Sequence, residues 1–346
     1  MAEPLVTAIV PAFNAAATLA ETLQSVAAQT WRAFECLIVD DGSTDETAAI
    51  AEAFCQADRR FTLLRKENGG VASARNHGLG RARGEFVAPL DADDLWHPHF
   101  LAEMVAEAVR SSERPGFVFC FSRWIDPQSR VVKTVVSHAV RGRVGRRFLY
   151  SNFVGNGSAL LLSRAAALEA GGYDESLRRR GLEGAEDFLL QMKIARRHDV
   201  AAVPLYLVGY RLRPGSMSND VERMIGSAEA AIEILEAESG RPEGADKALR
   251  LRAGAHALQL AWYKALTRRY GATLRLLARA YRLDPLRNPM VTALFASRLL
   301  TAPLRNRLAP PRPFAELDPA DPADARRLWL RRAVHKLDAR RLRRFV

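Results

Sequence analysis

The chain has 346 residues, 48% of them hydrophobic and 26% charged, which is typical of a soluble globular protein with one large domain and a smaller one. No apolar run reaches the roughly 18–20 residues of a membrane-spanning helix, and we expect no secretory signal. The net charge is +12, and twelve Lys and Arg residues lie from Thr301 onward. Three scattered cysteines without a C-x-x-C pair argue against a disulfide framework or a thiolate zinc site and favour the cytoplasm.

The first half of the chain alternates short apolar runs with amphipathic segments. The predicted strands are Val6–Ala12, Phe34–Asp40, Phe61–Arg65, Glu85–Leu90 and Phe117–Ser122. The predicted helices are Leu19–Gln29, Asp45–Cys55, Val71–Gly80 and Pro98–Arg110. This alternation predicts an α/β fold with a mostly parallel sheet and helices on both faces. The C-terminal ends of the strands then share one edge, where ligands bind.

After Arg123 the pattern is less regular, and from about Val221 it is helical throughout. The expected elements are strands at Val131–Val136 and Ala159–Ser163, helices at Arg143–Ser151 and Glu186–Arg197, and a helical hairpin of Ala255–Tyr270 and Ala272–Leu283. The hairpin turns at Tyr270-Gly271 and resembles one tetratricopeptide unit. A Pro-rich linker at Ala302–Pro322 and a basic amphipathic helix at Arg326–Phe345 follow. We predict one domain over 1–220 with halves at 1–115 and 116–220, a helical subdomain over 221–300, and the linker and basic helix over 301–346.

Two acidic clusters follow predicted strands directly. Asp40-Asp41-Gly42-Ser43 ends the second strand, and Asp91-Ala92-Asp93-Asp94 ends the fourth. In the predicted sheet both clusters point into one crevice, where their carboxylates repel one another unless a cation or hydrogen-bond donors compensate. A divalent metal with oxygen ligands is the simplest compensation. Alternatively, each cluster is a plain turn, with Asp45 and Asp94 capping the next helices. Their joint placement favours the metal.

Several segments together resemble glycosyltransferase family 2. They are Val6–Asn14, Gln29-Thr30-Trp31, Val39–Asp45, Asn68–Gly78 and Asp91–Asp94, and more thinly Gly157–Glu175, Glu186-Asp187 and Tyr210–Ser218. The resemblance implies a GT-A fold followed by an α-helical C-terminal extension, and the inverting transfer of a sugar from a UDP-, GDP- or dTDP-sugar to a hydroxyl. It also implies Mn²⁺ or Mg²⁺ as cofactor. We expect a glycan or lipid-linked acceptor and a role in the synthesis of cell-surface polysaccharide or glycolipid.

The resemblance implies a nucleotide site at the end of the first strand. Pro11, Ala12 and Phe13 would hold the base, and the Asp41 carboxylate would accept a hydrogen bond from a base N–H. Arg75 would lie near the donor phosphates or the acidic edge, and its guanidinium suits either partner; a structural salt bridge to an aspartate is the alternative.

Asp91-Ala92-Asp93 matches the DxD motif of the family, in which one carboxylate contacts the ribose and the other binds the metal. We assign the metal chiefly to Asp93, with Asp91 and Asp94 as further candidates, because the extra aspartate makes the register ambiguous. The ion would neutralise charge on the leaving nucleoside diphosphate. Arg213, where many relatives have His, is a phosphate-clamp candidate.

Glu186-Asp187 matches the acidic pair that opens a helix in similar enzymes. Asp187 is the expected general base, which takes a proton from the attacking hydroxyl. The helix N-terminus would lower its pKa, whereas desolvation would raise it. Glu186 and Asn156 are expected on the acceptor side. Alternatively, both acids only complement the helix dipole.

The sequence also has features that bear on functions other than sugar transfer. A nucleotidyltransferase would carry a G-x-G-T-R type loop where Pro11–Asn14 stands. A nucleic-acid-binding protein would interleave basic and aromatic residues on its surface, and we expect no nucleic acid partner. The basic helix Arg326–Phe345 either packs on the protein or docks on an anionic membrane, which would make the protein cytoplasmic and peripheral on the inner face of the plasma membrane. The absence of a Q-x-x-R-W motif argues against a processive synthase.

Overall fold

The computed structural model describes residues 3–110, 114–135, 138–213, 220–293, 312–314, 317–320, 334 and 336–341. The strands are β1 (Val6–Ala12), β2 (Phe34–Asp40), β3 (Phe61–Arg65), β4 (Phe86–Pro89), β5 (Leu95–Trp96), β6 (Phe117–Ile125), β7 (Val131–Thr134), β8 (Leu160–Ser163) and β9 (Val200–Arg211). The helices of the first half are α1 (Leu19–Ala27), α2 (Thr47–Ala57), α3 (Val71–Leu79) and α4 (Phe100–Val109). Those of the second half are α5 (Gly145–Tyr150), α6 (Arg164–Glu169), α7 (Ser176–Arg179), α8 (Glu186–Arg197), α9 (Val221–Ser239), α10 (Ala245–Leu266) and α11 (Tyr270–Leu283).

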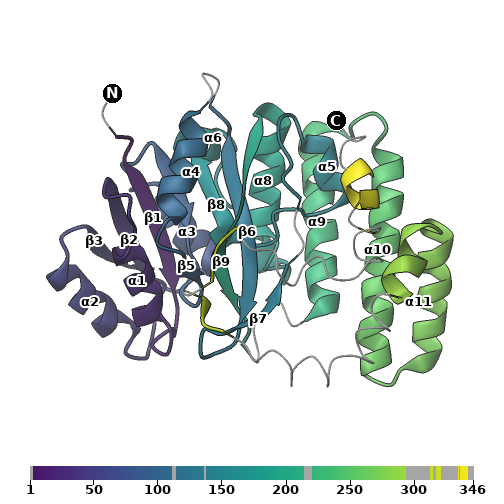
Figure 1. Cartoon of the computed structure of the whole chain (residues 1–346), viewed down its shortest axis with the longest axis horizontal. Helices are drawn as coiled ribbons and strands as arrows, with labels where there is room; N and C mark the ends of the chain where they lie inside the picture. The colour runs from purple at the N-terminus through teal and green to yellow at the C-terminus, as the bar shows by residue number, and fades with distance from the viewer. Residues whose placement is uncertain are drawn as a thin grey trace.

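In the described part of the chain, nine strands form one sheet (Figure 1). Eight of them follow the order β3-β2-β1-β4-β8-β6-β9-β5, and the ninth, β7, pairs with β6 outside this order. Strands β1 to β4 pair in parallel, as do β6 and β9, whereas β8 is antiparallel to both β4 and β6. Six strands therefore run in one direction, and β8, β5 and β7 run in the other. The predicted parallel arrangement is confirmed for the first four strands, and beyond β4 the sheet is mixed.

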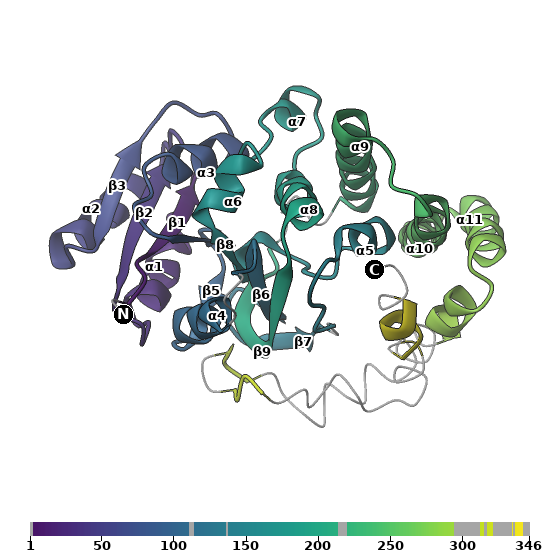
Figure 2. The ribbon, with the colours of Figure 1, turned by 90° about the horizontal axis from the view of Figure 1, so that it is seen from above.

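Two apolar cores cover the two faces of the sheet. Helices α1, α2 and α4 bury Leu19, Ala51 and Met104 on one face, together with strand residues such as Val10. On the other face, α3, α5, α6 and α8 pack on strand residues that include Phe119. Figure 2 shows the sheet between these two layers. The continuous apolar character of β1, β2 and β4 follows from this, because each strand is buried on both faces.

The helical extension shares the core of the first domain. Ala231, Ile232 and Leu235 of α9 and Leu251 of α10 belong to the same apolar cluster as Phe148 of α5. Figure 2 shows α8, α9, α10 and α11 in succession, leading away from the sheet. The division at residue 220/221 stays a prediction, and packing is continuous across it.

The structure differs from the predicted elements in several places, and β5, α6 and α7 are among the elements that were not predicted. Strand β9 was not predicted, and its Pro204 lies where the register against β6 shifts between Phe119 and Phe121. A proline has no N–H for a ladder, so an irregularity of this kind is where a strand accommodates it. The α10–α11 turn lies at 267–269 rather than at Tyr270-Gly271, because Tyr270 already begins α11.

Candidate active site

A cavity of about 380 Å³ opens at the sheet edge where β1, β4 and β9 end. Its wall includes Asp91 and Asp93 after β4, Asp187 at the start of α8 and Arg213 after β9. Together these residues span more than a hundred positions of the chain, and the shared direction of the strands brings them together. The cavity therefore joins the predicted DxD motif to the predicted base.

Each cavity-facing carboxylate of the DxD motif is bound by an arginine. Asp91 Oδ1 accepts a hydrogen bond from Arg75 Nη2 at 2.6 Å, and Asp93 Oδ2 lies 2.6 Å from Arg213 Nη2. Burial, followed by the charge of Asp91, raises the pKa of Asp93 even though Arg213 counteracts both. The arginines thus supply the positive charge that the crowded carboxylates require.

Arg75 connects the DxD motif to the acidic pair of α8. Its guanidinium is 3% exposed, and it donates from Nη2 to Asp91 and from Nη1 to Glu186 Oε1 at 2.8 Å. It also lies over the ring of Tyr173, 5.3 Å from the centroid. The salt-bridge alternative for Arg75 is therefore what the structure contains, with two acidic partners.

Asp187 lies against this group. A Cβ on Gly157 would lie 3.3 Å from Arg75 Nη2 and 3.4 Å from Asp187 Oδ2, so the missing side chain leaves room for both groups. Burial, and then the charge of Glu186, raises the pKa of Asp187 to about 7, although Arg75 and the backbone N–H of Phe188 lower it. Desolvation therefore outweighs the helix N-terminus. A carboxylate with this pKa can accept a proton near neutral pH.

Asp94 is not placed to bind a metal in the cavity, which corrects that assignment. Its side chain is fully buried and does not line the cavity. Its Oδ2 accepts a hydrogen bond from Ser158 Oγ at 2.6 Å, and its Oδ1 accepts one from the backbone N–H of Arg211 at 2.9 Å. Burial raises the pKa of Asp94 well above its usual range. Asp91 and Asp93 are therefore the carboxylates of this cluster that line the cavity, whereas Asp94 anchors β9.

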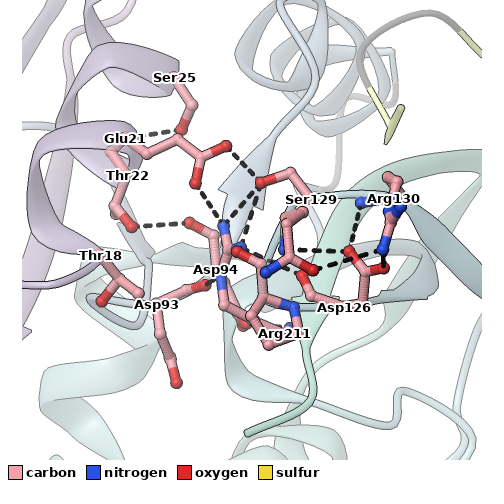
Figure 3. Close-up of polar contacts among 12 residues, drawn as sticks. Thr18, Glu21, Thr22, Ser25, Asp93, Asp94, Asp126, Ser129, Arg130 and Arg211 are labelled. Atoms are coloured by element: carbon pink, nitrogen blue, oxygen red, sulfur yellow. Dashed lines mark hydrogen bonds and ion pairs between the residues drawn. The ribbon is translucent and has the colours of Figure 1, made fainter. Parts of the chain in front are cut away.

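Arg211 is a structural residue that sequence reasoning missed (Figure 3). Its side chain is 1% exposed, and it donates to the backbone oxygen of Asp93 at 2.7 Å and to Glu21 Oε2 at 2.7 Å. It also donates to Ser129 Oγ at 3.1 Å and to the backbone oxygen of Asp126 at 3.2 Å. It thereby connects α1, the DxD turn and the β6–β7 connection. Only its proximity to the predicted clamp Arg213 could have drawn attention to it.

Asp41 is engaged inside the protein rather than lining the cavity. Its Oδ1 accepts hydrogen bonds from Lys66 Nζ at 2.7 Å and from the Gly69 N–H at 3.0 Å, and its Oδ2 accepts one from the Gly70 N–H at 2.7 Å. Gly70 has φ of 87°, which favours glycine, and it precedes α3. Ala12 is also buried, and its carbonyl accepts the Asp41 N–H. In this structure Asp41 and Ala12 therefore hold the neighbouring loops in place and do not line the cavity themselves.

Phe13 and Asn156 line the cavity, and each has a group that is not engaged within the described part of the protein. Phe13 is 52% exposed and is not a core residue, and it lines the cavity with Pro11. Asn156 is 9% exposed, and its Oδ1 is buried without a hydrogen-bond partner in the described residues. An unpaired buried amide is costly, so this side chain is placed to bind a group that enters the cavity.

Two further residues shape the site although they are outside the predicted set, Met224 in the cavity wall and the buried Ser158 behind it. Met224 of α9 lines the cavity, and a Cβ on Gly184 would lie 2.9 Å from its sulfur. Ser158 accepts a hydrogen bond from the Asp91 N–H at 3.1 Å and thereby fixes the DxD turn. Met224 had no sequence signal, whereas Ser158 lies in the segment Gly157–Glu175 that resembles the family but had no predicted role.

Within the described ranges, no three His, Cys, Asp or Glu side chains are grouped so that they could hold a metal unaided. Asp91 and Asp93 nevertheless fit a divalent ion. They face a cavity, the charge of Asp91 contributes to the raised pKa of Asp93, and both already attract cationic groups. Mg²⁺ and Mn²⁺ typically use one or two carboxylates and take their other ligands from phosphates and water.

The C-terminal predictions lie largely outside the described residues. Of the basic helix Arg326–Phe345, the structure describes 334 and 336–341, and of the loop Tyr210–Ser218 it describes 210–213. Asp338 accepts hydrogen bonds from Tyr150 Oη at 2.6 Å and from Arg287 Nε at 2.7 Å. No helix of the described ranges is long and apolar enough to cross a membrane. The free thiols are Cys36, Cys55 and Cys120.

Comparison with known proteins agrees with this fold. Similar solved structures include residues 1–349 of S. aureus TarS in complex with UDP-GlcNAc, 19% identical with a TM-score of 0.56, covering 84% of this chain and 87% of that one. They also include the mannosyltransferase PcManGT from Pyrobaculum calidifontis in complex with GDP-Man and Mn²⁺, 22% identical with a TM-score of 0.59, covering 88% and 83%. These likenesses establish the GT-A fold.

Sequence comparison points to one family. Residues 7–167 match the profile "Glycosyl transferase family 2". An uncharacterised glycosyltransferase of Rickettsia conorii is 27% identical over 213 residues, 61% of this chain but only 33% of that relative's length. The putative glycosyltransferase EpsH of Bacillus subtilis is 26% identical over 239 residues, covering 67% of this chain and 68% of the relative. Residues 7–167 of this chain, on a GT-A fold, thus match glycosyltransferase family 2.

Proposed function

We propose that this protein transfers a sugar with inversion from a nucleoside diphosphate sugar to a hydroxyl acceptor. The observation that carries the proposal is one cavity that holds Asp91 and Asp93 on one wall and Asp187 on another, with Arg75 between them. A metal-dependent leaving group and a base are the two chemical needs of the reaction, and this cavity has residues for both.

The donor would lie between β1 and the DxD turn. Pro11 and Phe13 offer an apolar surface for the base, and Phe13 is exposed enough to stack on it. Asp41 would act through the Gly69–Gly70 loop that it orders. The neighbours with bound UDP-GlcNAc and GDP-Man support a UDP- or GDP-sugar, and a dTDP-sugar remains within the proposal.

Asp93 and Asp91 would hold Mn²⁺ or Mg²⁺ together with the donor diphosphate, and the bound ion would neutralise charge on the leaving group. In the present structure Arg213 is paired with Asp93 at 2.6 Å. We propose that Arg213 exchanges this carboxylate for the donor diphosphate, which its guanidinium also suits. The wall then offers positive charge where the leaving group develops negative charge.

Asp187 would remove the proton from the acceptor hydroxyl while the hydroxyl oxygen attacks the anomeric carbon and the nucleoside diphosphate departs. Its pKa of about 7 suits this role. Glu186 would act by holding Arg75, since both of its oxygens already accept hydrogen bonds, from Arg75 Nη1 and the Gly184 N–H. The unpaired Asn156 amide would bind a sugar hydroxyl of donor or acceptor.

The proposed acceptor is a glycan or a lipid-linked glycan in cell-surface polysaccharide or glycolipid synthesis, and the proposed location is the cytoplasm. The three free thiols support a reducing compartment. We also propose, from the sequence pattern alone, that Arg326–Phe345 docks on the inner face of the plasma membrane.

A donor screen tests the function. Melting temperature is measured with UDP-GlcNAc, GDP-mannose and dTDP-glucose, each with and without Mn²⁺, for the wild type and for Asp93→Asn. A saturating ligand at a hundredfold excess over its Kd stabilises the native state by about 2.7 kcal/mol, which is a shift of several degrees. We expect such a shift for at least one sugar nucleotide with Mn²⁺, and a smaller one in Asp93→Asn. If no donor raises the melting temperature under any condition, the proposal is wrong.

A further inference from the structure

The end of the α10–α11 hairpin carries unusually exposed apolar side chains. Leu266, at the last position of α10, is 69% exposed, and Tyr270 and Leu274 on the first turns of α11 are 64% and 69% exposed. Among the other large apolar side chains in the described ranges only Leu286, at 65%, is comparable. Because Tyr270 and Leu274 are four positions apart on one helix, they lie on the same side of α11. We call Leu266, Tyr270 and Leu274 the hairpin tip.

These apolar residues are not needed to hold the hairpin together. The contact between the helices is made by Ala257 and Leu258 of α10 with Ala280 of α11, and Leu277 packs against them. Exposed apolar groups of this size, gathered at one point rather than scattered, are typical of a surface that meets an apolar partner.

Arginines follow the hairpin tip along the turn and α11. The stretch from Leu266 to Leu283 contains five arginines and no Asp or Glu. The arginines, all exposed, are Arg268, Arg269, Arg275, Arg279 and Arg282. The last three are spaced i, i+4 and i+7 and therefore share one face of α11. None of the five forms an ion pair with a carboxylate in the part of the chain that the structure describes.

Charge decides which partner this surface fits. A second copy that met it across a two-fold axis would bring arginines against arginines, which is repulsive. A nucleic acid would pair with the arginines but would leave the aliphatic Leu266 and Leu274 without a partner. An anionic bilayer offers phosphates to the arginines and hydrocarbon to the leucines, and it places a tyrosine at the interface, where its ring and hydroxyl are both satisfied.

We propose that the hairpin tip and its arginines dock the protein on the surface of an anionic lipid bilayer. This surface is distinct from the C-terminal basic segment, whose residues 336–341 are partly engaged within the protein. There Asp338 is bound by Tyr150 and Arg287, and Arg341 pairs with Asp284. The proposal does not depend on the sugar-transfer reaction, because it concerns a surface outside the cavity.

Vesicle co-sedimentation of the full-length protein tests the proposal. Vesicles of phosphatidylcholine with 30% phosphatidylglycerol are compared with pure phosphatidylcholine vesicles, at low and high salt. The variant is Arg275→Gln, Arg279→Gln and Arg282→Gln together, and its control is Arg32→Gln, Arg59→Gln and Arg81→Gln together, which removes the same charge from exposed sites in the first half. Each basic residue near an anionic surface changes partitioning about fivefold, so we expect roughly a hundredfold loss for the hairpin variant. The control should keep most of its binding.

A second pair of variants separates lipid from other polyanions. Leu266→Ser, Tyr270→Ser and Leu274→Ser keep every charge but remove the apolar contact, and Val109→Ser, Val132→Ser and Leu168→Ser are the matched control at other exposed sites. The tip variant should lose vesicle binding and the control should not. Two results would overturn the proposal: equal losses in variant and control, or vesicle binding that survives in both hairpin variants. Nucleic-acid retention that the serine variant leaves unchanged, without binding to anionic vesicles, would also overturn it.

Circular dichroism and the donor-induced melting shift show that each variant is folded and has an intact cavity. These side chains are exposed, so their replacement should leave both unchanged. Failure of the donor screen in the wild type would contradict the proposed reaction and leave the docking result standing, so the two proposals fail separately.

Discussion

Arginines in two regions of this protein are in opposite electrostatic situations. At the cavity, Arg75 and Arg213 each have a carboxylate oxygen 2.6 Å away. On the α10–α11 hairpin, five exposed arginines have no carboxylate partner within the described ranges. The cavity arginines neutralise a site that must hold several acids close together. The hairpin arginines instead give a surface a net charge that no carboxylate of the described ranges neutralises. Under the two proposals above, residues of one type organise chemistry in one region and offer a binding surface in the other.

The largest effect that we expect in the cavity comes from its base. Asp187→Asn removes the proton acceptor but keeps the shape of the side chain, so transfer should fall about 10²- to 10⁴-fold while donor binding persists. Initial rates with a radiolabelled donor, together with the melting shift, measure the two effects. Full activity in this variant would remove Asp187 from the mechanism.

Removing an arginine from each region should lower the free energy of unfolding by very different amounts. Arg75→Met leaves Glu186 buried beside Asp91 without its cation, and breaking such a pair costs about 3 kcal/mol or more of unfolding free energy. Arg275→Met, at an exposed site without a partner, should change stability by less than about 0.5 kcal/mol. Urea unfolding of both variants gives the comparison, and similar costs would contradict it.

The pH dependence follows from the pKa of Asp187, which burial raises to about 7 from an ordinary 3.8. The proposed base is ionised above this pH, so kcat/KM should level off there and fall about tenfold for each pH unit below it. The stability of the native state depends on pH in the opposite direction to kcat/KM. Because the native pKa is above the unfolded value, the buried carboxyl costs the native state stability as pH rises from about 4 to 7. Asp187→Asn should therefore melt at a higher temperature than the wild type at pH 8 and nearly equally at pH 4.

The smallest effect concerns the competition between Arg213 and the metal for Asp93. The pair is partly exposed, so it is worth up to about 1 kcal/mol, or about fivefold in affinity. Arg213→Ala should bind Mn²⁺ alone up to fivefold more tightly and bind the donor more weakly. Mn²⁺ titration followed by electron paramagnetic resonance measures this. Arg223→Ala, which loses an ion pair with Glu183 instead, is the control and should leave Mn²⁺ affinity unchanged.

Much of the nucleotide-binding half could be predicted because its signals are local. Strands β1 to β4 are short apolar runs buried on both faces, and an acidic turn directly follows β2 and β4. The directions of these strands then bring the turn of Asp91 and Asp93 to the cavity edge. The pattern of an apolar strand and the acidic turn after it, within ten residues, was enough to predict where Asp91 and Asp93 lie.

What could not be predicted depends on contacts between distant segments. Asp94 and Asp93 are neighbours of the same type, and only the fold buries one against Ser158 and leaves the other in the cavity. Arg211 has partners on α1 and in the β6–β7 connection, up to 190 positions away. The pKa of Asp187 likewise depends on how completely other elements cover α8. No spacing rule in a single chain carries this information.

Met224 of α9 forms part of the cavity wall although it lies beyond the segment that matches the family. Selectivity between substrates can therefore diverge through an appended helix while every carboxylate of the shared domain stays in place. Related enzymes with different helices at this point would then accept different sugars through the same reaction chemistry. The substrate specificity of such a protein would therefore depend in part on helices outside the shared domain.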